Sequence, residues 1–299
     1  MSRPHFVIAG QTVMVSRRCT QRQFLCLPEN VVNQILGYCL AYAAQYFGLV
    51  LHAFCFMSNH LHIIFTDVRG NRSEFFRWFF EFTAKCLNVH WGRWENLWAA
   101  GRPSRVLLVD AAAQLAETVY VITNPVKANL VTAAHHWPGL VSLPTRIGRA
   151  QVFKRPTKFF RADGPLPAAA TLRTEPLPAF ADLSAEEYRA LIAQAVADKE
   201  AELDQKRRQE GRSVLRRREV LRQSPFDRPQ NHAPRRKLNP RVACRDKWAR
   251  IETLSRLKAF ETSYRKAWQR WRQGEHEVLF PYGTYALRLQ AGVNCAGPP

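Results

Sequence analysis

The stretch from Leu49 to Asp67 constrains the fold of this chain more than any other. It reads LVLHAFCFMSNHLHIIFTD, two strand-sized apolar runs separated by Met57-Ser58-Asn59. Short apolar runs on either side of residues that favour turns are typical of a β-hairpin. We therefore expect two adjacent strands joined by a tight turn.

The second of these runs opens with His60 and His62. Successive side chains of a strand point to opposite faces, so the two imidazoles share one face while Leu61 and Ile63 lie on the other. Two neutral imidazoles can hold one divalent metal and leave several coordination positions for oxygen ligands. A single His-x-His is a short pattern, however, and two ordinary strand histidines with satisfied hydrogen bonds would produce it as well.

A second informative segment runs from Tyr120 to Val131 and reads YVITNPVKANLV. If it is helical, Tyr120 and Asn124 are four residues apart and share a face. Asn124 precedes a proline, which also makes it a good helix N-cap and disfavours a continuous helix at that point. Tyr120 could equally be a buried residue of an amphipathic helix.

These two segments together resemble a known family. HAFCFMSNHLH, from His52 to His62, resembles the signature of the HUH endonucleases. The segment that begins at Tyr120 is similar to the corresponding segment of the REP-associated tyrosine transposases, which are single-tyrosine members of that group. The resemblance covers residues 49–67 and 115–140 and is weaker elsewhere.

The resemblance implies a function and a site. Tyr120 would be the catalytic nucleophile, and His60, His62 and Asn124 would hold one Mg²⁺ or Mn²⁺. The implied activity is that of a metal-dependent single-stranded DNA endonuclease and strand transferase, a transposase. It would cleave DNA near hairpin structures through a 5′-phosphotyrosine intermediate and rejoin the ends. The sequence does not indicate which residue would act as the general base that deprotonates Tyr120.

Three other classes of protein share part of this pattern. A non-catalytic protein that binds single-stranded or structured nucleic acid, derived from such a transposase, is the main alternative. A two-histidine phosphoesterase would need two His-x-Ser/Thr motifs, and only one His-x-His occurs here. A plasmid replication initiator would carry lysine three residues after its tyrosine, where this chain has Thr123.

The net charge indicates a polyanionic partner. The chain has 44 Lys and Arg against 24 Asp and Glu, a formal charge of +20 carried mostly by arginine. Such an excess is typical of proteins that bind nucleic acid. Near the expected sheet we predict DNA contacts by Arg17, Arg18, Arg102 and Lys127. In the basic run from Lys206 to Arg222 we predict phosphate contacts, without base selection, by Arg207, Arg208, Arg212, Arg216, Arg217 and Arg218.

Composition also bears on the compartment. The seven cysteines contain no Cys-x-x-Cys and lie mostly in apolar runs, so they are expected to be small core residues in a reducing compartment. No apolar run approaches the length of a membrane span and no signal-peptide layout is present. We expect a cytoplasmic, nucleoid-associated protein without a membrane partner. The sequence does not decide between a monomer and a homodimer.

Periodicity and caps predict the order strand, helix, strand, strand, helix, strand, helix over the first part of the chain. This order fits an α+β fold: a ferredoxin-like (RRM-like) antiparallel sheet with helices on one face and an appended helix that ends with Tyr120. We expect a catalytic domain over residues 1–143 and a Pro- and Ala-rich linker over 144–183. Residues 184–299 are expected to be a basic, mainly helical region. The aromatic helix around Phe75 and Trp78 favours a packed core over a stacking platform for bases.

Overall fold

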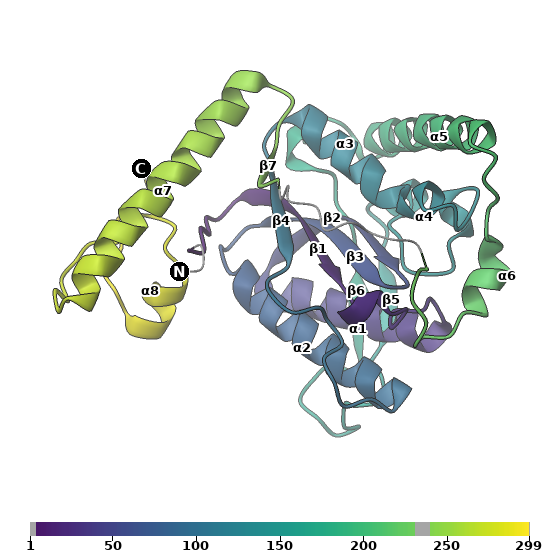
Figure 1. Ribbon diagram of the computed structural model, residues 1–299, viewed down its shortest axis with the longest axis horizontal. Helices are drawn as coiled ribbons and strands as arrows, with labels where there is room; N and C mark the ends of the chain where they lie inside the picture. The colour runs from purple at the N-terminus through teal and green to yellow at the C-terminus, as the bar shows by residue number, and fades with distance from the viewer. Residues whose placement is uncertain (1–3, 231–239, 299) are drawn as a thin grey trace.

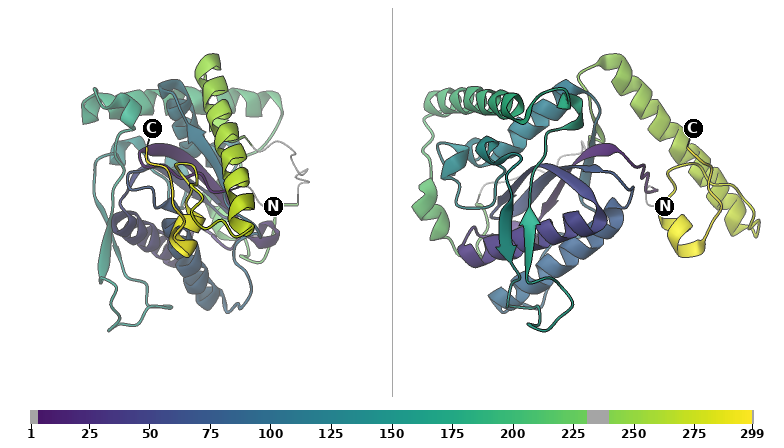
Figure 2. Two further views of the ribbon diagram at one scale, coloured as in Figure 1. Left: turned by 90° about the vertical axis from the view of Figure 1, so that its left-hand side faces the viewer. Right: turned by 180° about the vertical axis from the view of Figure 1, so that it is seen from behind.

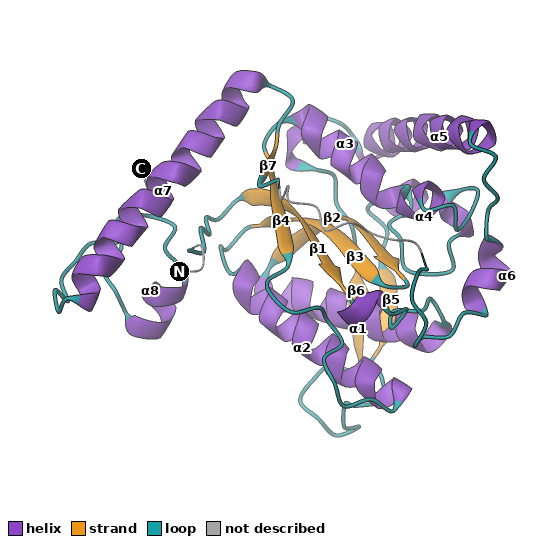
Figure 3. Cartoon of the chain, viewed as in Figure 1, coloured by secondary structure: helices purple, strands orange, loops and turns teal. Residues whose placement is uncertain are grey.

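The computed structural model describes residues 4–230 and 240–298 of the chain, which form a mixed sheet covered by helices (Figure 1). The helices and strands, coloured by type in Figure 3, are β1 (Gln11–Arg18), α1 (Asn30–Phe47), β2 (Leu49–Met57), β3 (His60–Asp67), α2 (Arg72–Trp91), β4 (Ser104–Leu108), α3 (Ala111–Ile122), α4 (Asn124–Lys127), β5 (Gln151–Lys154), β6 (Ala169–Leu172), α5 (Ala185–Gln209), α6 (Arg216–Leu221), β7 (Val242–Ala243), α7 (Lys247–Arg272) and α8 (Ala286–Ala291). A short 3-10 helix, η1 (Thr20–Arg22), follows β1.

The main sheet has five strands in the order β2-β3-β1-β4-β7. β2 and β3 pair antiparallel around the Ser58-Asn59 turn, which confirms the expected hairpin. β1 pairs antiparallel with both β3 and β4. The expected sheet was antiparallel throughout, and this was wrong at one edge. There Leu107 of β4 pairs with Val242 of β7 in a parallel ladder. This strand comes from far along the chain and covers an edge of the sheet that would otherwise be open.

Helices cover both faces of this sheet, whereas the sequence indicated one helical face and one appended helix. On one face α1 and α2 pack against alternate residues of β1 and β3, including Val15 and Ile63. On the other face α3 packs on the sheet and α5 packs over α3, where Tyr188 and Ile192 of α5 are fully buried. Both helical layers are visible in Figure 1. The second layer forms because the apolar side of α3 extends beyond what the sheet can cover.

The aromatic helix α2 belongs to the core, as expected. The rings of Phe75 and Phe79 are fully buried and stacked with centroids 5.5 Å apart. The ring of Trp78 lies 4.8 Å from that of Tyr42 on α1. These rings therefore hold α1 and α2 together and leave no stacking platform on this helix.

The segment 144–183 was expected to be a linker, but part of it is packed into the protein. β5 and β6 form a two-stranded antiparallel sheet that lies against α1, as the rear view in Figure 2 shows. Phe153 and Leu172 are buried in the same core as α1. A Cβ at Gly37 would lie 2.3 Å from the ring of Phe153, so this contact requires glycine on the helix. The Pro and Ala content concealed the few apolar residues that anchor the segment. The division of the chain into units at 143 and 184 stays a prediction.

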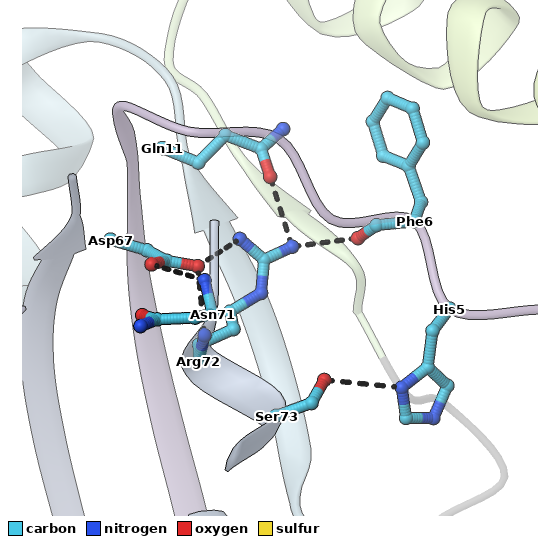
Figure 4. Close-up of polar contacts among 7 residues, drawn as sticks. All are labelled: His5, Phe6, Gln11, Asp67, Asn71, Arg72 and Ser73. Carbon is cyan, nitrogen blue, oxygen red and sulfur yellow. Dashed lines mark hydrogen bonds and ion pairs between the residues drawn. The ribbon is translucent and has the colours of Figure 1, made fainter. Parts of the chain in front are cut away.

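At the end of β3 that lies away from the histidines, the structure contains a buried ion pair (Figure 4). The Asp67 carboxylate accepts hydrogen bonds from the backbone N–H groups of Asn71 and Arg72, and the Arg72 guanidinium lies 3.4 Å from it. Arg72 Nη2 also donates to the carbonyl of Phe6 and to the side chain of Gln11, at 2.6 and 3.0 Å. The pair fastens the start of α2 and the N-terminal segment to the sheet.

α7 and α8 stand beside the sheet, on the side of the N-terminal segment (Figures 1 and 2). The N–H of Val7 donates to the carbonyl of Gly283, and Phe6 pairs with Thr284. The ring of Phe6 lies 4.6 Å from that of Phe260 on α7. The C-terminal segment therefore packs back onto the first part of the chain.

Candidate active site

The imidazoles of His60 and His62 lie side by side at the beginning of β3. In the ladder with β1, His60 is opposite Arg18 and His62 is opposite Ser16. Alternation along the strand places both rings on the face that carries α3, and their centroids are 5.1 Å apart at nearly a right angle. The prediction of a shared face is confirmed.

The two rings differ in their hydrogen bonds. His60 Nδ1 lies 2.6 Å from the Asn59 side-chain oxygen. An amide oxygen only accepts, so this contact puts the proton on Nδ1 and leaves the Nε2 lone pair of His60 available. His62 is 7 % exposed, and its Nδ1 has no hydrogen-bond partner among the described residues. A buried ring nitrogen without a partner is uncommon, and binding of a ligand there is one reason for it.

Both imidazoles are neutral at physiological pH. Burial lowers the pKa of His60 to about 4, and the positive charge of Arg18 adds to this effect. Burial lowers the pKa of His62 to about 3, with further contributions from His60, Lys127 and Arg18. Neutral imidazole is the form that binds a metal. A metal can therefore bind at this site without first displacing a proton from either imidazolium.

Tyr120 lies on the last turn of α3 and reaches the histidine pair. Its ring centroid is 5.4 Å from that of His62, and the two rings meet edge to face. The Lys127 ammonium lies 4.6 Å from the centroid of the tyrosine ring. Asp110 fixes the start of α3 by accepting a hydrogen bond from Ala113 N–H at 2.7 Å. The helix thus carries the phenol from the end of β4 to the histidine pair on β3.

Asn124 also reaches this place, although the helix is interrupted before it. α3 ends at Ile122, Thr123 has φ −86° and ψ 5°, and α4 begins at Asn124. Pro125 has no N–H to continue the helical hydrogen bonds and disfavours a helical residue before it, which explains the break. The Asn124 side chain lies close enough to His60 to raise the pKa of that imidazole slightly, and it is 6 % exposed. The residue that precedes α4 is Thr123, so Asn124 does not occupy the N-cap position that we considered for it.

The donor atoms at this site fit a divalent metal. Two neutral ring nitrogens and one amide oxygen, from His60, His62 and Asn124, are donors that such ions accept. In residues 4–230 and 240–298, no group of three or more His, Cys, Asp or Glu side chains is placed to hold a metal. An ion here would therefore need the amide of Asn124 or the oxygens of a substrate to complete its coordination.

The sheet arginines lie on different faces. Arg18 is exposed and faces the histidines, opposite His60. Arg17, one residue earlier, points to the other face, where its guanidinium lies 4.4 Å from the ring centroid of Phe80 and burial lowers its pKa. Arg102 is exposed on the loop before β4. Strand alternation thus separates two consecutive arginines that looked equivalent in the sequence, and it gives Arg17 a packing contact.

The C-terminal arginines also divide into two groups. The Arg207 side chain is 8 % exposed and pairs with Asp204 on α5, so it is not presented to a phosphate. Arg208 pairs with Asp204 at 2.7 Å and Arg212 with Glu210 at 3.1 Å, and both remain exposed. The remaining arginines of the set are exposed on α6, without an ion pair in the described part of the chain. They are Arg216, Arg217 and Arg218.

The structure adds one residue that sequence reasoning missed. Asn59 was read only as a turn residue, yet its amide orients the ring of His60 and its carbonyl accepts from Cys19 N–H at 2.8 Å. Its position directly before a candidate ligand was the available signal. His52, within the same motif, is fully hydrogen-bonded: its two nitrogens contact the Glu175 carbonyl and the Thr66 hydroxyl.

Two transposases of known structure are similar to part of this chain. No family model and no curated protein matches this sequence. The chain is similar to transposases in structure. One is a REP-associated tyrosine transposase bound to a REP hairpin, with a TM-score of 0.40 and 18 % identity over 46 % of this chain and 81 % of that chain. Another is a proposed transposase from Deinococcus radiodurans R1, with a TM-score of 0.29 and 18 % identity over 42 % of this chain and 97 % of that one.

None of the helices among the described residues combines the length and the apolar character that crossing a bilayer requires.

Proposed function

We propose that this protein is a metal-dependent enzyme that nicks and rejoins single-stranded DNA, a tyrosine transposase of the HUH type. The observation that carries the proposal is the meeting of two neutral imidazoles, a phenol and an amide. They come from β3, α3 and α4, and His62 lies between His60 and Tyr120. These are the groups that the sequence resemblance requires, and segments far apart in the chain bring them together.

The architecture supports the same proposal. The strand order β2-β3-β1-β4, together with α1 and α2, is the one that the ferredoxin-like unit of our proposal requires. α3 is then the appended helix, and the tyrosine on its last turn faces the histidine strand. The sheet face with His60, His62 and Arg18 is the surface on which the DNA backbone would lie.

The reaction would be an in-line displacement at phosphorus. The Tyr120 oxygen forms a bond to phosphorus as the bond to the 3′ oxygen of the preceding nucleotide breaks. The products are a 5′-phosphotyrosine and a free 3′-hydroxyl, which takes up a proton as the phenol loses one. Since the phosphate stays esterified, a 3′-hydroxyl can attack the phosphotyrosine and restore a DNA strand without ATP.

The side chains around Tyr120 have separate tasks. His60, His62 and Asn124 would hold Mg²⁺ or Mn²⁺, which supplies Lewis-acid stabilisation of charge on the phosphate oxygens. Lys127, close to the tyrosine ring, would add a positive charge near the same oxygens. Arg18 would hold the neighbouring phosphate and so position the strand.

The substrate we propose is a single strand that carries a hairpin, in the nucleoid of the cytoplasm. A nucleophile at the end of a helix must meet a backbone that can bend toward it, and unpaired DNA does this more easily than a duplex. Fully paired DNA of the same sequence should therefore be cleaved far more slowly.

Replacement of Tyr120 tests this function. Tyr120→Phe removes one oxygen and keeps the ring against His62, so binding to a labelled hairpin oligonucleotide should persist while the denaturation-resistant protein–DNA adduct disappears. Tyr46→Phe is the matched control, because Tyr46 is 62 % exposed on α1. An adduct that persists in Tyr120→Phe and in the wild type alike would assign the nucleophile to another residue.

A further inference from the structure

A hollow borders the loop between β1 and α1, and the proposed chemistry does not use it. It has a volume of about 760 Å³ and two walls. One wall comes from the loop between β1 and α1, with Gln21, Gln23 and Phe24. The other comes from the segment after α6, with Gln223, Phe226 and Arg228. Small-molecule sites in proteins occupy about 300–1,000 Å³, so the hollow is large enough for a ligand.

The two walls are bonded to each other. The N–H of Phe24 donates to the carbonyl of Asp227 at 3.0 Å, and the side-chain amide of Gln23 donates to the carbonyl of Phe226 at 3.1 Å. The oxygen of the same Gln23 amide accepts from Arg93 at 3.0 Å. Gln23 is therefore engaged on both sides, and it holds a segment of the C-terminal region against the first part of the chain.

The hollow is coupled to the candidate active site through Asn59. The Asn59 side-chain nitrogen donates to the carbonyl of Arg22 at 3.2 Å, and its oxygen contacts His60. The wall that contains Gln21 thus lies next to the turn that precedes His60. Through these two contacts of Asn59 the wall adjoins the strand that carries both histidines.

The backbone of that wall is held in an unfavourable conformation. Gln21 and Arg22 both have positive φ, 48° and 63°, in the left-handed region that residues with a Cβ adopt rarely. Such residues are found preferentially at ligand sites and are kept in place by surrounding contacts. Here the bonds from Asn59 and Phe24 on either side hold the loop.

The lining of the hollow matches an unpaired nucleobase. In the part of the chain that the structure describes, the side-chain amides of Gln21 and Gln223 make no hydrogen bond, and each amide offers a donor and an acceptor. Base edges present the same combination of groups. The ring of Phe226 is 50 % exposed, which suits stacking on a base, and Arg228 is exposed for a phosphate.

We propose that this hollow binds an unpaired nucleobase of the DNA strand, next to the phosphate that Tyr120 attacks. The inference rests on the proposed function. It gives the C-terminal region a part in base selection, whereas the sequence suggested that this region acts through charge alone. The segment after α6 would supply the stacking ring and one amide, and the loop after β1 would supply the other amide.

Photo-cross-linking locates the base directly. The probe is a DNA hairpin with unpaired flanks in which 5-iodouracil replaces one flanking base at a time, bound to the full-length protein. Irradiation should join one flank position to the tryptic peptide that begins at Gln223 and contains Phe226. Cross-links confined to other peptides, at every position tested, would overturn the proposal.

Affinity measurements then test the chemistry. With the wild type, an abasic site at the cross-linked position should weaken binding about 5- to 150-fold, the range that base stacking contributes. In Phe226→Ala this penalty should vanish, Phe226→Tyr should retain it, and Gln21→Ala and Gln223→Ala should each reduce it. Trp248→Ala is the control, because Trp248 is 74 % exposed on α7 and does not line the hollow. A thermal melt of each variant distinguishes a folding defect from a specific effect on base binding.

The outcomes distinguish this proposal from the function on which it rests. If Phe226→Ala keeps the full abasic penalty while the wild type still forms the Tyr120 adduct, the hollow is not the base site and the function stands. If the cross-link and the penalty are found but no strand gives an adduct, the hollow binds bases and the proposed catalysis is wrong.

Discussion

The two ends of β3 contain buried polar groups of very different kinds. At the Asp67 end, the carboxylate and the Arg72 guanidinium neutralise one another and make a dense set of hydrogen bonds to backbone and side chains (Figure 4). At the other end, His60 and His62 are uncharged, a ring nitrogen of His62 has no partner in the described residues, and the surrounding charges are positive.

This difference indicates which buried polar groups stabilise the fold and which take part in the proposed chemistry. The Asp67–Arg72 pair is neutralised within the protein and stabilises the fold, although Arg72 Nε has no partner among the described residues. At the histidine end the charges that act on the imidazoles are positive, and the buried nitrogen of His62 costs free energy unless a ligand completes it. We therefore expect substitutions at the Asp67 end to lower stability and leave the chemistry alone. Substitutions at the histidine end should impair the chemistry and leave stability nearly unchanged.

The largest effect should come from the histidine pair. His60→Ala and His62→Ala should each abolish metal-dependent cleavage, and EDTA should do the same to the wild type, because the ion loses its nitrogen donors in the variants and is itself removed by the chelator. Adduct formation on a labelled hairpin, with and without added Mn²⁺, measures this.

His52→Ala is the matched control for the histidine variants. This imidazole is buried in the same hairpin but both of its nitrogens are hydrogen-bonded within the protein. The variant should lose stability and keep metal-dependent cleavage by the molecules that remain folded. Undiminished cleavage by the wild type in EDTA would remove the metal from the mechanism.

Next in size is the effect of breaking the ion pair. Arg72→Leu leaves the Asp67 carboxylate buried without its counter-charge and should cost roughly 3–5 kcal/mol of stability, the usual range when one partner of a buried pair is removed. Urea unfolding followed by tryptophan fluorescence measures this change. Arg77→Leu, on the exposed side of α2, is the control. A loss of cleavage per folded Arg72→Leu molecule would contradict the division between the two ends.

The pH dependence of stability sharpens the comparison further. In the folded protein burial lowers the pKa of His52 and of His60 to about 4, below the value of about 6.5 in an unfolded chain. Between these values the unfolded state binds more protons, so metal-free protein should lose stability as the pH falls from about 6.5 toward 4. His52 alone should contribute roughly 3 kcal/mol to this loss.

Urea midpoints measured in EDTA at several pH values test this slope. His52→Gln should show a shallower dependence than the wild type, since its amide does not titrate. Equal slopes for the two proteins would show that His52 does not titrate as its burial requires.

The smallest expected effect concerns the exposed arginines of the C-terminal region. Replacing Arg208, Arg212, Arg216, Arg217 and Arg218 with glutamine should weaken binding to matched and scrambled hairpins alike. The slope of log affinity against log salt should shrink by about 0.7 for each phosphate of a single strand that the variant no longer neutralises. Titrations at several salt concentrations give both quantities. Loss of discrimination with an unchanged slope would refute a purely electrostatic role for these residues.

Part of the fold and of the site could be predicted because it depends on local rules. The turn at Ser58-Asn59 follows from its residue types, and the common face of His60 and His62 follows from strand alternation. The nearness of Tyr120 to His62 came from the family resemblance. Periodicity could not have supplied it, because no local rule relates residues that far apart in the chain.

Other features escaped prediction for physical reasons that concern particular residues. Phe153 anchors a segment that looked like a linker, because a single ring against Gly37 suffices when its partner lies elsewhere in the chain. Arg207 looked like its neighbours until the fold removed its side chain from solvent, since its partner Asp204 is only three residues earlier on the same helix. The parallel strand β7 contributes two residues to the sheet, too few to give a periodic signal.

The sequence by itself determined the order of the elements from β1 to α3, the positive charge and the residue types that can carry out the proposed chemistry, since these depend on side chains and their near neighbours. Only the tertiary structure decided which polar groups are satisfied. Hydrogen bonds and burial join residues that are distant in the chain, as Asn59 joins His60 to the wall of the hollow and Gln23 joins that wall to Phe226. The two ends of β3 therefore differ through the segments that the fold brings to each of them.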